Sequence, residues 1–376
     1  MDFWFTIEPY VYLNINNNKV LLYNTLDGEY LEFEEGAVVD FLKGIYSEEN
    51  CGVLFLSEEQ YSDETFKNFV KLVREKFMGD VIPVTKSSGK PIQILPYVNF
   101  HLSLKNKGEY VLYNLEYLLQ SLFEVNIHID FNSDINIIEQ FIAKLPDNVG
   151  LNIIYEKSDI VIDGFLEFLR NKFKYTTISL PYSYLLDRPE IVKKDFIYRV
   201  IFDHQVDSLV FESILRITKN IHNRFIFNIS SFDDFDKWEK LVSKYGIDEY
   251  IINPEYTGDN LDFFENYIYL NKEDLFSEII SMRTLFRRHI ININDFGKIH
   301  ILSNGDVYAN MRKPVIGNIY KNGIDEIINN EIKNGQSWLR IRDNNPCNQC
   351  LYQYICPSPS DIELAIGKEN LCLIRK

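Results

Sequence analysis

Strand-like and helix-like segments alternate through the middle of the chain, and this alternation limits the folds that the chain can adopt. Seven runs have the length and pattern of strands, at residues 92–100, 126–131, 150–155, 176–180, 196–203, 224–229 and 249–253. Amphipathic helical stretches lie between them, for example at residues 111–123, 135–144, 160–173 and 232–245. Repeats of this kind form parallel sheets, because each crossover returns the chain to the same end of the sheet. We therefore predict an α/β fold with a parallel sheet or a partial (β/α) barrel of the TIM type over residues 90–285.

The first residues form a different pattern. Three short runs at residues 10–16, 19–25 and 29–34 are separated by the turn-forming sequences NNN and LDG, which predicts a three-stranded antiparallel meander. Two helical segments follow, at residues 36–46 and 62–78, the second with Ser62 as the expected N-cap. We therefore predict a winged-helix-like domain over residues 1–84, joined to the barrel by a polar linker at residues 85–91.

Charge and hydropathy exclude several kinds of partner. The formal net charge is −16, which argues against nucleic acid, because a phosphate backbone requires a basic surface. No apolar run approaches the ~20 residues that cross a bilayer, and the first residues lack the pattern of a secretory signal. We expect a cytoplasmic protein without a membrane partner. In that compartment clustered cysteines bind metal more often than they form disulfides.

Four of the five cysteines lie within the last 30 residues of the chain, and the fifth, Cys51, lies almost 300 residues upstream. Cys347, Cys350, Cys356 and Cys372 have the spacing Cys-x2-Cys-x5-Cys-x15-Cys. Four soft ligands that include a Cys-x2-Cys pair suit tetrahedral zinc or an iron–sulfur cluster. The spacing therefore predicts a metal site and leaves the two metals open.

This cysteine run resembles the core of the SPASM domain, the C-terminal extension of many peptide-modifying radical SAM enzymes. The preceding sequence fits the same family, with the hairpin NDFGKIHILSNGDVYANM, the segment VIGNIY and the stretch SWLRIRDNNPCNQC. The resemblance extends over residues 290–376 and implies a SPASM-like iron–sulfur domain. It implies one [4Fe–4S] cluster, held by Cys347, Cys350, Cys356 and Cys372. The second cluster of a full SPASM domain would need cysteines where this chain has Asn294, Asn310 and Ser360.

A SPASM domain normally follows a radical SAM barrel, which the strand–helix pattern of residues 90–285 resembles. Radical SAM chemistry requires Cys-x3-Cys-x2-Cys after the first strand, and that part of this chain, PIQILPYVNFHLSLKNKGEY, contains no cysteine. No cysteine occurs anywhere between residues 52 and 346. We therefore expect a degenerate barrel that does not cleave S-adenosylmethionine (SAM).

The N-terminal domain resembles a RiPP recognition element, the module that binds the leader of a ribosomally synthesised precursor peptide. In that family the leader adds a strand to the edge of the sheet, by β-augmentation. The resemblance places the edge at residues 30–34 and the facing helix at residues 62–78. The candidate peptide contacts are Tyr30, Leu31, Phe33, Phe66 and Phe69. The alternative is that these side chains form only the core of the module.

Together the three parts resemble the pseudo-radical-SAM/SPASM proteins of peptide-maturation systems. The resemblance implies a non-catalytic protein that binds a precursor peptide and an active radical SAM maturase, with one cluster as a structural element or an electron relay. One alternative is an enzyme with non-radical chemistry at Asp130, Asp203 and His204, which end predicted strands. The other alternative is a zinc-stapled peptide-binding protein. The remaining histidines show no metal-ligand spacing and are interpreted as structural: His101, His128, His222, His289 and His300.

Overall fold

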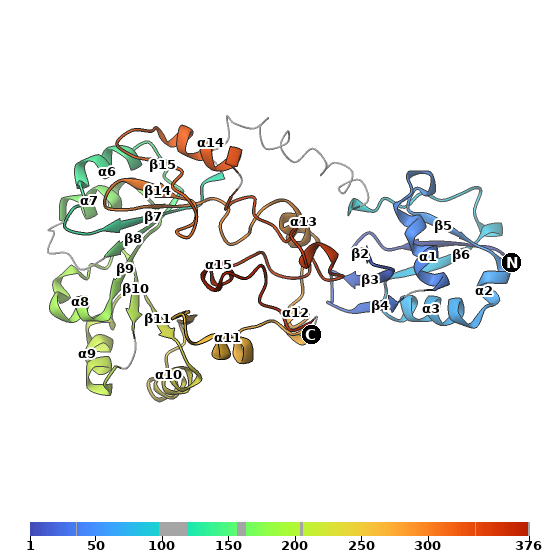
Figure 1. The fold of residues 1–376 in the computed structure, drawn as a ribbon, viewed down its shortest axis with the longest axis horizontal. Coiled ribbons are helices and arrows are strands. Elements are labelled where there is room, and N and C mark those ends of the chain that lie inside the picture. Colours follow the sequence, from blue (N-terminus) through green and yellow to red (C-terminus); the bar gives the residue numbers. More distant parts are fainter. Residues whose placement is uncertain are drawn as a thin grey trace.

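The computed structural model describes residues 1–34, 36–97, 119, 121–155, 163–203, 206–334 and 336–374. Figure 1 shows the N-terminal domain at one end of an elongated molecule and a large sheet at the other, with the C-terminal tail between them. Within the described residues, no helix combines the length and the apolar character needed to span a membrane.

The large sheet has nine strands in the order β12-β11-β10-β9-β8-β7-β13-β14-β15. Its first six strands in chain order pair in parallel, and they confirm six of the seven predicted strands of the middle region. They are β7 (Glu124–Ile129), β8 (Gly150–Tyr155), β9 (Thr176–Pro181), β10 (Ile197–Phe202), β11 (Asn223–Ile229) and β12 (Tyr250–Pro254).

The predicted first strand, at residues 92–100, is not formed in its described part. Residues 92–97 contain no strand, and residues 98–100 lie outside the described part. The place beside β7 is taken by β13 (Lys298–Ile301), which pairs with β7 in parallel. A strand from the C-terminal region thus completes this side of the sheet, a long-range pairing that local sequence patterns do not reveal.

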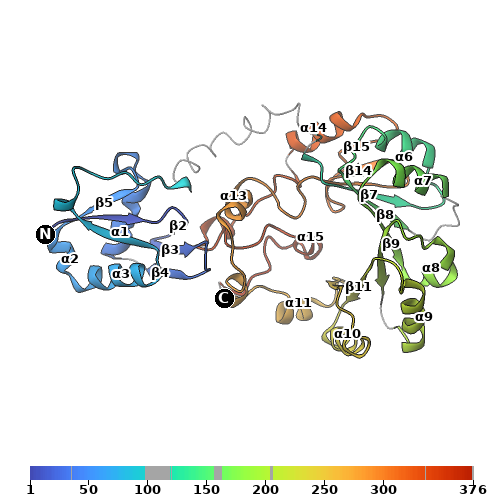
Figure 2. The ribbon, with the colours of Figure 1, turned by 180° about the vertical axis from the view of Figure 1, so that it is seen from behind.

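The sheet is open, because β12 and β15 (Gly317–Asn318) are outer strands of the described residues and do not pair with each other. The expected TIM-type architecture is therefore present only as a parallel-rich open sheet. Helices cover one face of it in Figures 1 and 2. They are α6 (Ile135–Ile142), α7 (Asp163–Lys172), α8 (Tyr182–Asp187), α9 (Ser208–Thr218) and α10 (Phe232–Tyr245). The helix expected at residues 111–123 lies mainly outside the described residues.

Alternation along each strand separates an apolar face from a polar one. In β7, Val125, Ile127 and Ile129 are fully buried in the core that the helices cover. The neighbouring side chains point to the opposite face, where Asn152 donates to Asn126 (2.8 Å) and accepts from Ser179 (2.7 Å). Because both amides and the hydroxyl are buried, this ladder satisfies polar groups that would otherwise be costly inside the protein.

The N-terminal domain contains the predicted meander, β2 (Val11–Asn16), β3 (Lys19–Asn24) and β4 (Tyr30–Glu34). A second antiparallel sheet was not predicted, and its strands are β1 (Phe3–Ile7), β5 (Val53–Leu56) and β6 (Gly79–Pro83). Helices α1 (Ala37–Lys43), α2 (Glu58–Ser62) and α3 (Glu64–Glu75) complete the domain. Asp63, and not Ser62, caps α3, because its carboxylate accepts from the Thr65 amide at 2.8 Å.

The meander is buried on both of its faces. One face packs on α1 and α3, for example through Phe33 and Phe69, whose ring centroids are 5.3 Å apart. The other face shares a core with Leu275 of α12 (Lys272–Leu275), Leu285 of α13 (Met282–Ile290) and Ile355 of the tail. The N-terminal domain and the cysteine-bearing tail are therefore packed together.

The C-terminal region begins with the predicted hairpin, in which β13 pairs with β14 (Asp306–Tyr308). Gly305 in its turn has φ +82°, and a Cβ there would lie 2.2 Å from the Tyr320 ring, so the turn requires glycine. Helices α14 (Ile324–Asn334) and α15 (Asp361–Ile366) follow. Since β13–β15 belong to the large sheet, the core of the barrel-like region continues across the predicted boundary at residues 285–290.

Candidate metal centre

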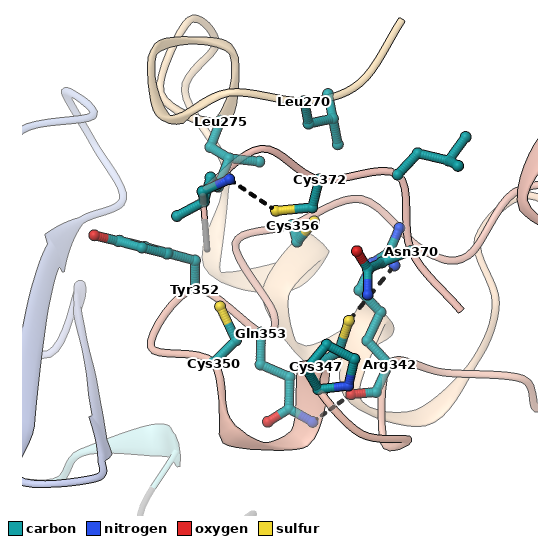
Figure 3. Close-up of a pocket in the computed structure, with 13 residues that line it drawn as sticks. Leu270, Leu275, Arg342, Cys347, Cys350, Tyr352, Gln353, Cys356, Asn370 and Cys372 are labelled. Atoms are coloured by element: carbon teal, nitrogen blue, oxygen red, sulfur yellow. Dashed lines mark hydrogen bonds between the residues drawn. The ribbon is translucent and has the colours of Figure 1, made fainter. Parts of the chain in front are cut away.

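Four cysteines, the ones that the sequence analysis selected, line a single pocket (Figure 3). Leucine and isoleucine side chains form much of its wall, which limits water around the sulfur atoms. Its lining residues are Leu270, Leu275, Arg342, Pro346, Cys347, Cys350, Tyr352, Gln353, Cys356, Asn370, Leu371, Cys372 and Ile374. Cys51 is exposed in the N-terminal domain and is not part of this pocket.

Three of these cysteines are positioned by one compact segment, residues 346–356, which we call the metal loop. It begins with a 3-10 turn, Cys347–Gln349, in which the Cys350 amide donates to the Cys347 carbonyl at 3.0 Å. The Cys356 amide donates to the Tyr352 carbonyl at 2.8 Å. These local bonds fold the loop so that the first three thiols face the same cavity.

Cys372 reaches the pocket through a separate contact. Its neighbour Leu371 accepts a hydrogen bond from the Leu270 amide (3.0 Å), and Leu373 donates to the Leu270 carbonyl (3.0 Å), which forms a parallel bridge. The Cys372 sulfur accepts from the Ile374 amide at 3.3 Å. Amide donors to cysteine sulfur are among the features that set the potential of iron–sulfur centres.

The donor set fits an iron–sulfur cluster. Within the described ranges, no three His, Cys, Asp or Glu side chains are arranged around a point that could hold one metal ion. The four thiols instead border a common cavity. Tetrahedral zinc requires all four sulfur atoms about 2.3 Å from one point, whereas a [4Fe–4S] cluster is a larger body bound at four corners. Thiols spread around a cavity suit the larger body.

Burial disfavours free thiolates at Cys347 and Cys356. Burial raises the pKa of Cys356 to about 12, against the opposing effect of Arg342, and Cys372 and Cys347 raise it further. Burial also raises the pKa of Cys347. Thiols with such pKa values are protonated at neutral pH, yet a metal takes the thiolate. Binding a positively charged metal centre is therefore what stabilises the thiolates here.

Arg342 supplies a further positive charge at this pocket. Its guanidinium side chain is 6% exposed, pairs with Glu363 at 2.9 Å and lies 4.0 Å from the Cys347 sulfur. Burial alone would lower its pKa, but the charges of Cys356 and Glu363 raise the pKa above its ordinary value. The sequence analysis missed this residue, although an arginine five positions before a Cys-x2-Cys pair was a signal that could have suggested it.

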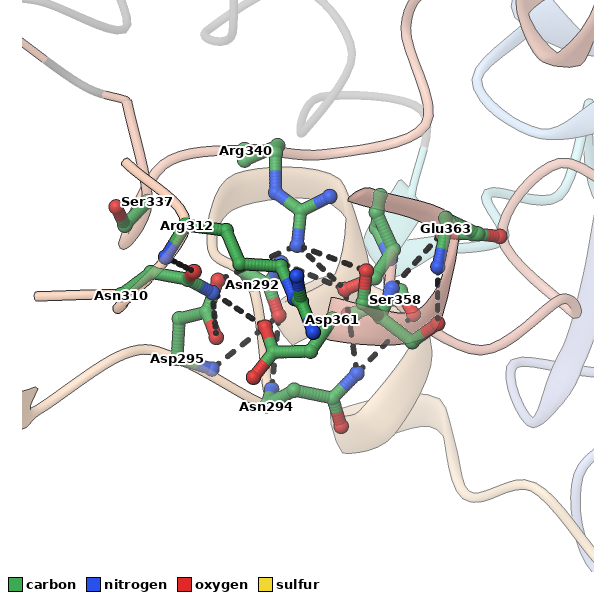
Figure 4. Close-up of polar contacts among 12 residues, drawn as sticks. Asn292, Asn294, Asp295, Asn310, Arg312, Ser337, Arg340, Ser358, Asp361 and Glu363 are labelled. Carbon is green, nitrogen blue, oxygen red and sulfur yellow. Dashed lines mark hydrogen bonds and ion pairs between the residues drawn. The ribbon is translucent and has the colours of Figure 1, made fainter. Parts of the chain in front are cut away.

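Asn294, Asn310 and Ser360, which the resemblance to SPASM domains places at second-cluster positions, lie in a region of dense hydrogen bonds (Figure 4). Asn294 donates to the carbonyls of Ser358 (3.2 Å) and Pro359 (3.3 Å). Asn310 donates to Asp295 at 3.1 Å and also to Asp361. We call this group, with Asn292, Arg340 and Ser360, the polar network. Ser360 caps α15 in a reciprocal capping box with Glu363.

The polar network contains a buried charge. Asp295 pairs with Arg340 at 3.4 Å, and the two side chains are 8% and 15% exposed. Burial raises the pKa of Asp295 to about 6, and Asp361 adds to the increase, while Arg340 and Asn310 oppose it. Amide, hydroxyl and carboxyl groups are poor ligands for iron–sulfur clusters. The residues of the network therefore do not suit a cluster, and hydrogen bonds and an ion pair hold them in place.

The structure separates the candidate residues for non-radical catalysis. Asp130 accepts from Ser303 at 2.8 Å, and Asp203 accepts from Asn228 at 3.2 Å. They follow β7 and β10, which are three strand spacings apart, roughly 14 Å. His204 lies outside the described residues. Asp130 and Asp203 are thus hydrogen-bonded to different neighbours and form no acid–base pair.

The candidate peptide-contact residues have different surroundings. Phe66 and Phe69 are 4% and 2% exposed and belong to the domain core, as does Leu31. Phe33 packs on Phe69, and Tyr30 stacks on Phe276 with ring centroids 3.9 Å apart. Three of these side chains are therefore buried and two are half-buried against aromatic neighbours, and a role in peptide binding remains a prediction that depends on the backbone of β4.

The described histidines have three kinds of surroundings. His128 and His300 lie near each other, with ring centroids 5.8 Å apart, and burial together with His128 lowers the pKa of His300 to about 4. His289 contacts the Tyr12 hydroxyl at 3.1 Å and stacks on Tyr354. His222 is exposed, and His101 lies outside the described residues. None of these described histidines lines the cysteine pocket.

Comparison with known proteins identifies the C-terminal region. Residues 294–351 match the family model of SPASM, described as an iron-sulfur cluster-binding domain. No curated protein matches the chain. Among solved structures, the chain shows a similarity to the VirB11 ATPase of the Brucella suis type IV secretion system in complex with sulphate. The two chains are 9% identical with a TM-score of 0.14, and the alignment covers 79% of this chain and 88% of that chain. So low a TM-score supports no argument about the fold. The SPASM match covers the hairpin and the first two pocket cysteines, and it indicates an iron–sulfur cluster-binding domain of the SPASM type in this part of the chain.

Proposed function

We propose that this chain is a non-catalytic, pseudo-radical-SAM/SPASM protein that binds a ribosomally synthesised precursor peptide and carries one [4Fe–4S] cluster. The observation that supports it most strongly is the contrast between two positions of one domain. Four cysteines converge on one pocket, while the residues of the second cluster position are joined by hydrogen bonds.

Cys347, Cys350, Cys356 and Cys372 would hold the cluster. When bound, a [4Fe–4S] cluster supplies a rigid cross-link and one-electron transfer. Because all four ligands are cysteines, no corner of the cluster is left for a substrate. The role is therefore structural or that of an electron relay to a partner, and not Lewis-acid catalysis.

The barrel-like region would not cleave SAM. Cleavage requires three further cysteines after the first strand, and the chain has none between residues 52 and 346. A maturation system that contains this protein then needs a second enzyme to perform the radical reaction. We therefore propose an active radical SAM maturase as its partner.

The edge of β4 supports the proposed peptide-binding role. The Asn24 amide donates to the Glu29 carbonyl at 2.8 Å, and hydrogen-bonded pairs alternate along an antiparallel ladder. Tyr30, Glu32 and Glu34 therefore direct their backbone groups away from β3. β4 is an outer strand of its sheet in the described residues, so an extended peptide could satisfy these groups by β-augmentation.

Anaerobic purification tests the proposal. We expect a brown protein with broad absorption near ~400 nm and about four iron atoms per chain, and no 5′-deoxyadenosine after incubation with SAM and a reductant. A colourless protein that binds one zinc ion would instead support a zinc-stapled peptide-binding protein. Appreciable formation of 5′-deoxyadenosine would overturn the non-catalytic role.

A further inference from the structure

The β2–β3 hairpin of the N-terminal domain is hydrogen-bonded to the metal loop. The side-chain amide of Asn14 donates to the Leu351 carbonyl at 2.7 Å, that of Asn16 to Asn348 at 3.1 Å, and that of Asn17 to Gln349 at 3.2 Å. The acceptors lie between, or directly beside, the first two cysteines of the loop. Three amides from one hairpin thus hold the backbone that carries Cys347 and Cys350.

The turn of this hairpin is shaped for the contact. Asn17 and Asn18 have φ values of 48° and 58°, and a two-residue turn with positive φ at both positions is the type that matches the twist of a hairpin. The two side chains differ in their partners. Asn17 contacts the metal loop, whereas Asn18 accepts from Lys43 at 2.9 Å.

A second set of contacts joins the metal loop to β4. The Tyr352 hydroxyl donates to Glu32 at 2.9 Å, and Lys272 of α12 donates to the same carboxylate at 2.7 Å. Phe276, on which Tyr30 stacks, is also in edge contact with Tyr352, at a centroid distance of 6.0 Å. The strand with the open edge is therefore tied to the residue two positions after Cys350.

A groove lies where these elements meet. Its walls include Glu32 and Glu34 of β4, Lys272 of α12 and the segment Cys350–Tyr352 of the metal loop. Cys350 lines both this groove and the cysteine pocket. A peptide strand added to β4 would consequently lie beside the same loop that holds the metal.

We propose that the β2–β3 hairpin and Glu32 form an outer shell of the metal centre, and that metal loading therefore fixes the position of the β4 edge. The inference rests on the proposed cluster. Ligand loops depend on their metal for order, and the three asparagine contacts and the Glu32 contact require an ordered loop. Because coupling between sites is reciprocal, a peptide that orders β4 would also strengthen retention of the metal.

Hydrogen exchange of the full chain tests this coupling, with the iron-loaded protein compared with protein from which iron has been removed. We expect exchange in residues 11–34 to be about tenfold faster after removal. The sheet formed by β1, β5 and β6 is the internal control, and its exchange should not change. Equal exchange of β4 in the two states would overturn the proposal.

Two glycine variants of the same turn separate this coupling from general stability. Glycine keeps the positive φ of the turn, so Asn17→Gly removes the contact with Gln349, and Asn18→Gly removes only the contact with Lys43. The double variant Asn16→Ala/Asn17→Gly removes two of the three asparagine contacts. We expect it to keep full iron content, while iron removal should change its β4 exchange at least threefold less than in the wild type. Asn18→Gly should behave as the wild type, and an identical response of the two variants would contradict the proposal.

Metal analysis of the purified protein distinguishes a failure of the proposed cluster from a failure of the proposed coupling. A chain that binds neither iron nor zinc at the four cysteines would remove the proposed cluster itself. A chain that binds about four iron atoms, with β4 exchange that does not respond to their removal, would leave the cluster in place and overturn only the coupling.

Discussion

The cysteine pocket and the polar network both cross-link parts of the chain, the first through a proposed metal site and the second through hydrogen bonds. Both join segments that are distant in the sequence. The pocket connects the metal loop to Cys372 and, through it, to Leu270. The network connects the hairpin residue Asn310 to the segment that carries Ser358 and Asp361. The comparison teaches that hydrogen bonds can join distant segments as a metal site can, although polar groups supply attachment and no redox chemistry.

The two regions differ in what the residues require from their surroundings. Burial raises the pKa of Cys347 and Cys356, so their thiolates require a metal to stabilise them. The network satisfies its amides and its buried carboxylate within the protein, through Arg340 and backbone carbonyls. The pocket should therefore respond to metal removal, and the network should not.

The largest effect is expected from Cys350→Ser. Loss of one of four ligands should abolish iron binding and destabilise the metal loop by several kcal/mol, because the binding energy of a structural metal is also folding energy. Iron analysis and thermal unfolding measure both effects. Cys51→Ser is the control, since Cys51 is exposed and distant from the pocket, and it should match the wild type. Iron retention by Cys350→Ser would contradict the ligand assignment.

The next effect is expected from Asn310→Leu, in the network. Asn310 is 2% exposed and is a shared donor to Asp295 and Asp361. Its loss leaves the buried Asp295 carboxylate without this partner, which should lower the free energy of unfolding by about 2–4 kcal/mol. Denaturant unfolding measures the change, and iron content should stay the same. The exposed Asn334→Leu is the control. Loss of iron in Asn310→Leu would break the distinction between the two regions.

A pH effect of similar or smaller size is expected from Asp295. Its pKa rises from 3.8 to about 6 in the folded protein. Between these pH values the unfolded chain releases the proton first, so the free energy of unfolding decreases as the pH rises and becomes constant above pH about 6. The contribution is about 2–3 kcal/mol at most. Unfolding of Asp295→Asn between pH 4 and pH 7 should lack this decrease, and an unchanged pH profile would contradict the assignment.

Local patterns predicted the parts of the structure that depend on neighbouring residues. Six of the seven predicted strands were identified from apolar runs, and the spacing grouped the four cysteines that line one pocket. The pairing of β13 with β7 could not be predicted, because its partners are about 170 residues apart in the chain and periodicity carries no information on which strands become neighbours. The same holds for the ion pair of Arg342 with Glu363.

One missed feature did leave a signal in the sequence. Strands that are buried on both faces have continuous apolar runs in place of alternation. Val11–Asn16 begins with three apolar residues, and Lys19–Asn24 contains four in succession. These runs indicate that the meander is covered on both sides, as the shared core with Leu285 and Ile355 demonstrates. The contacts of Asn16 and Asn17 with the metal loop had no comparable signal, since the asparagines of an NNN sequence are explained by the turn itself.

The smallest effect is expected from Ser360→Ala, at a position where a cluster ligand would be needed in a full SPASM domain. In this protein the Ser360 hydroxyl accepts from the Glu363 amide at 3.4 Å, and the Glu363 carboxylate accepts from the Ser360 amide at 2.8 Å. Loss of an N-cap costs about 1 kcal/mol, so thermal unfolding should shift by a few degrees while iron content remains unchanged. Ser360→Thr, which keeps the hydroxyl, should restore most of the stability. Because Glu363 also pairs with Arg342 at the cysteine pocket, a loss of iron in Ser360→Ala would mean that the two regions are coupled through α15 and not independent.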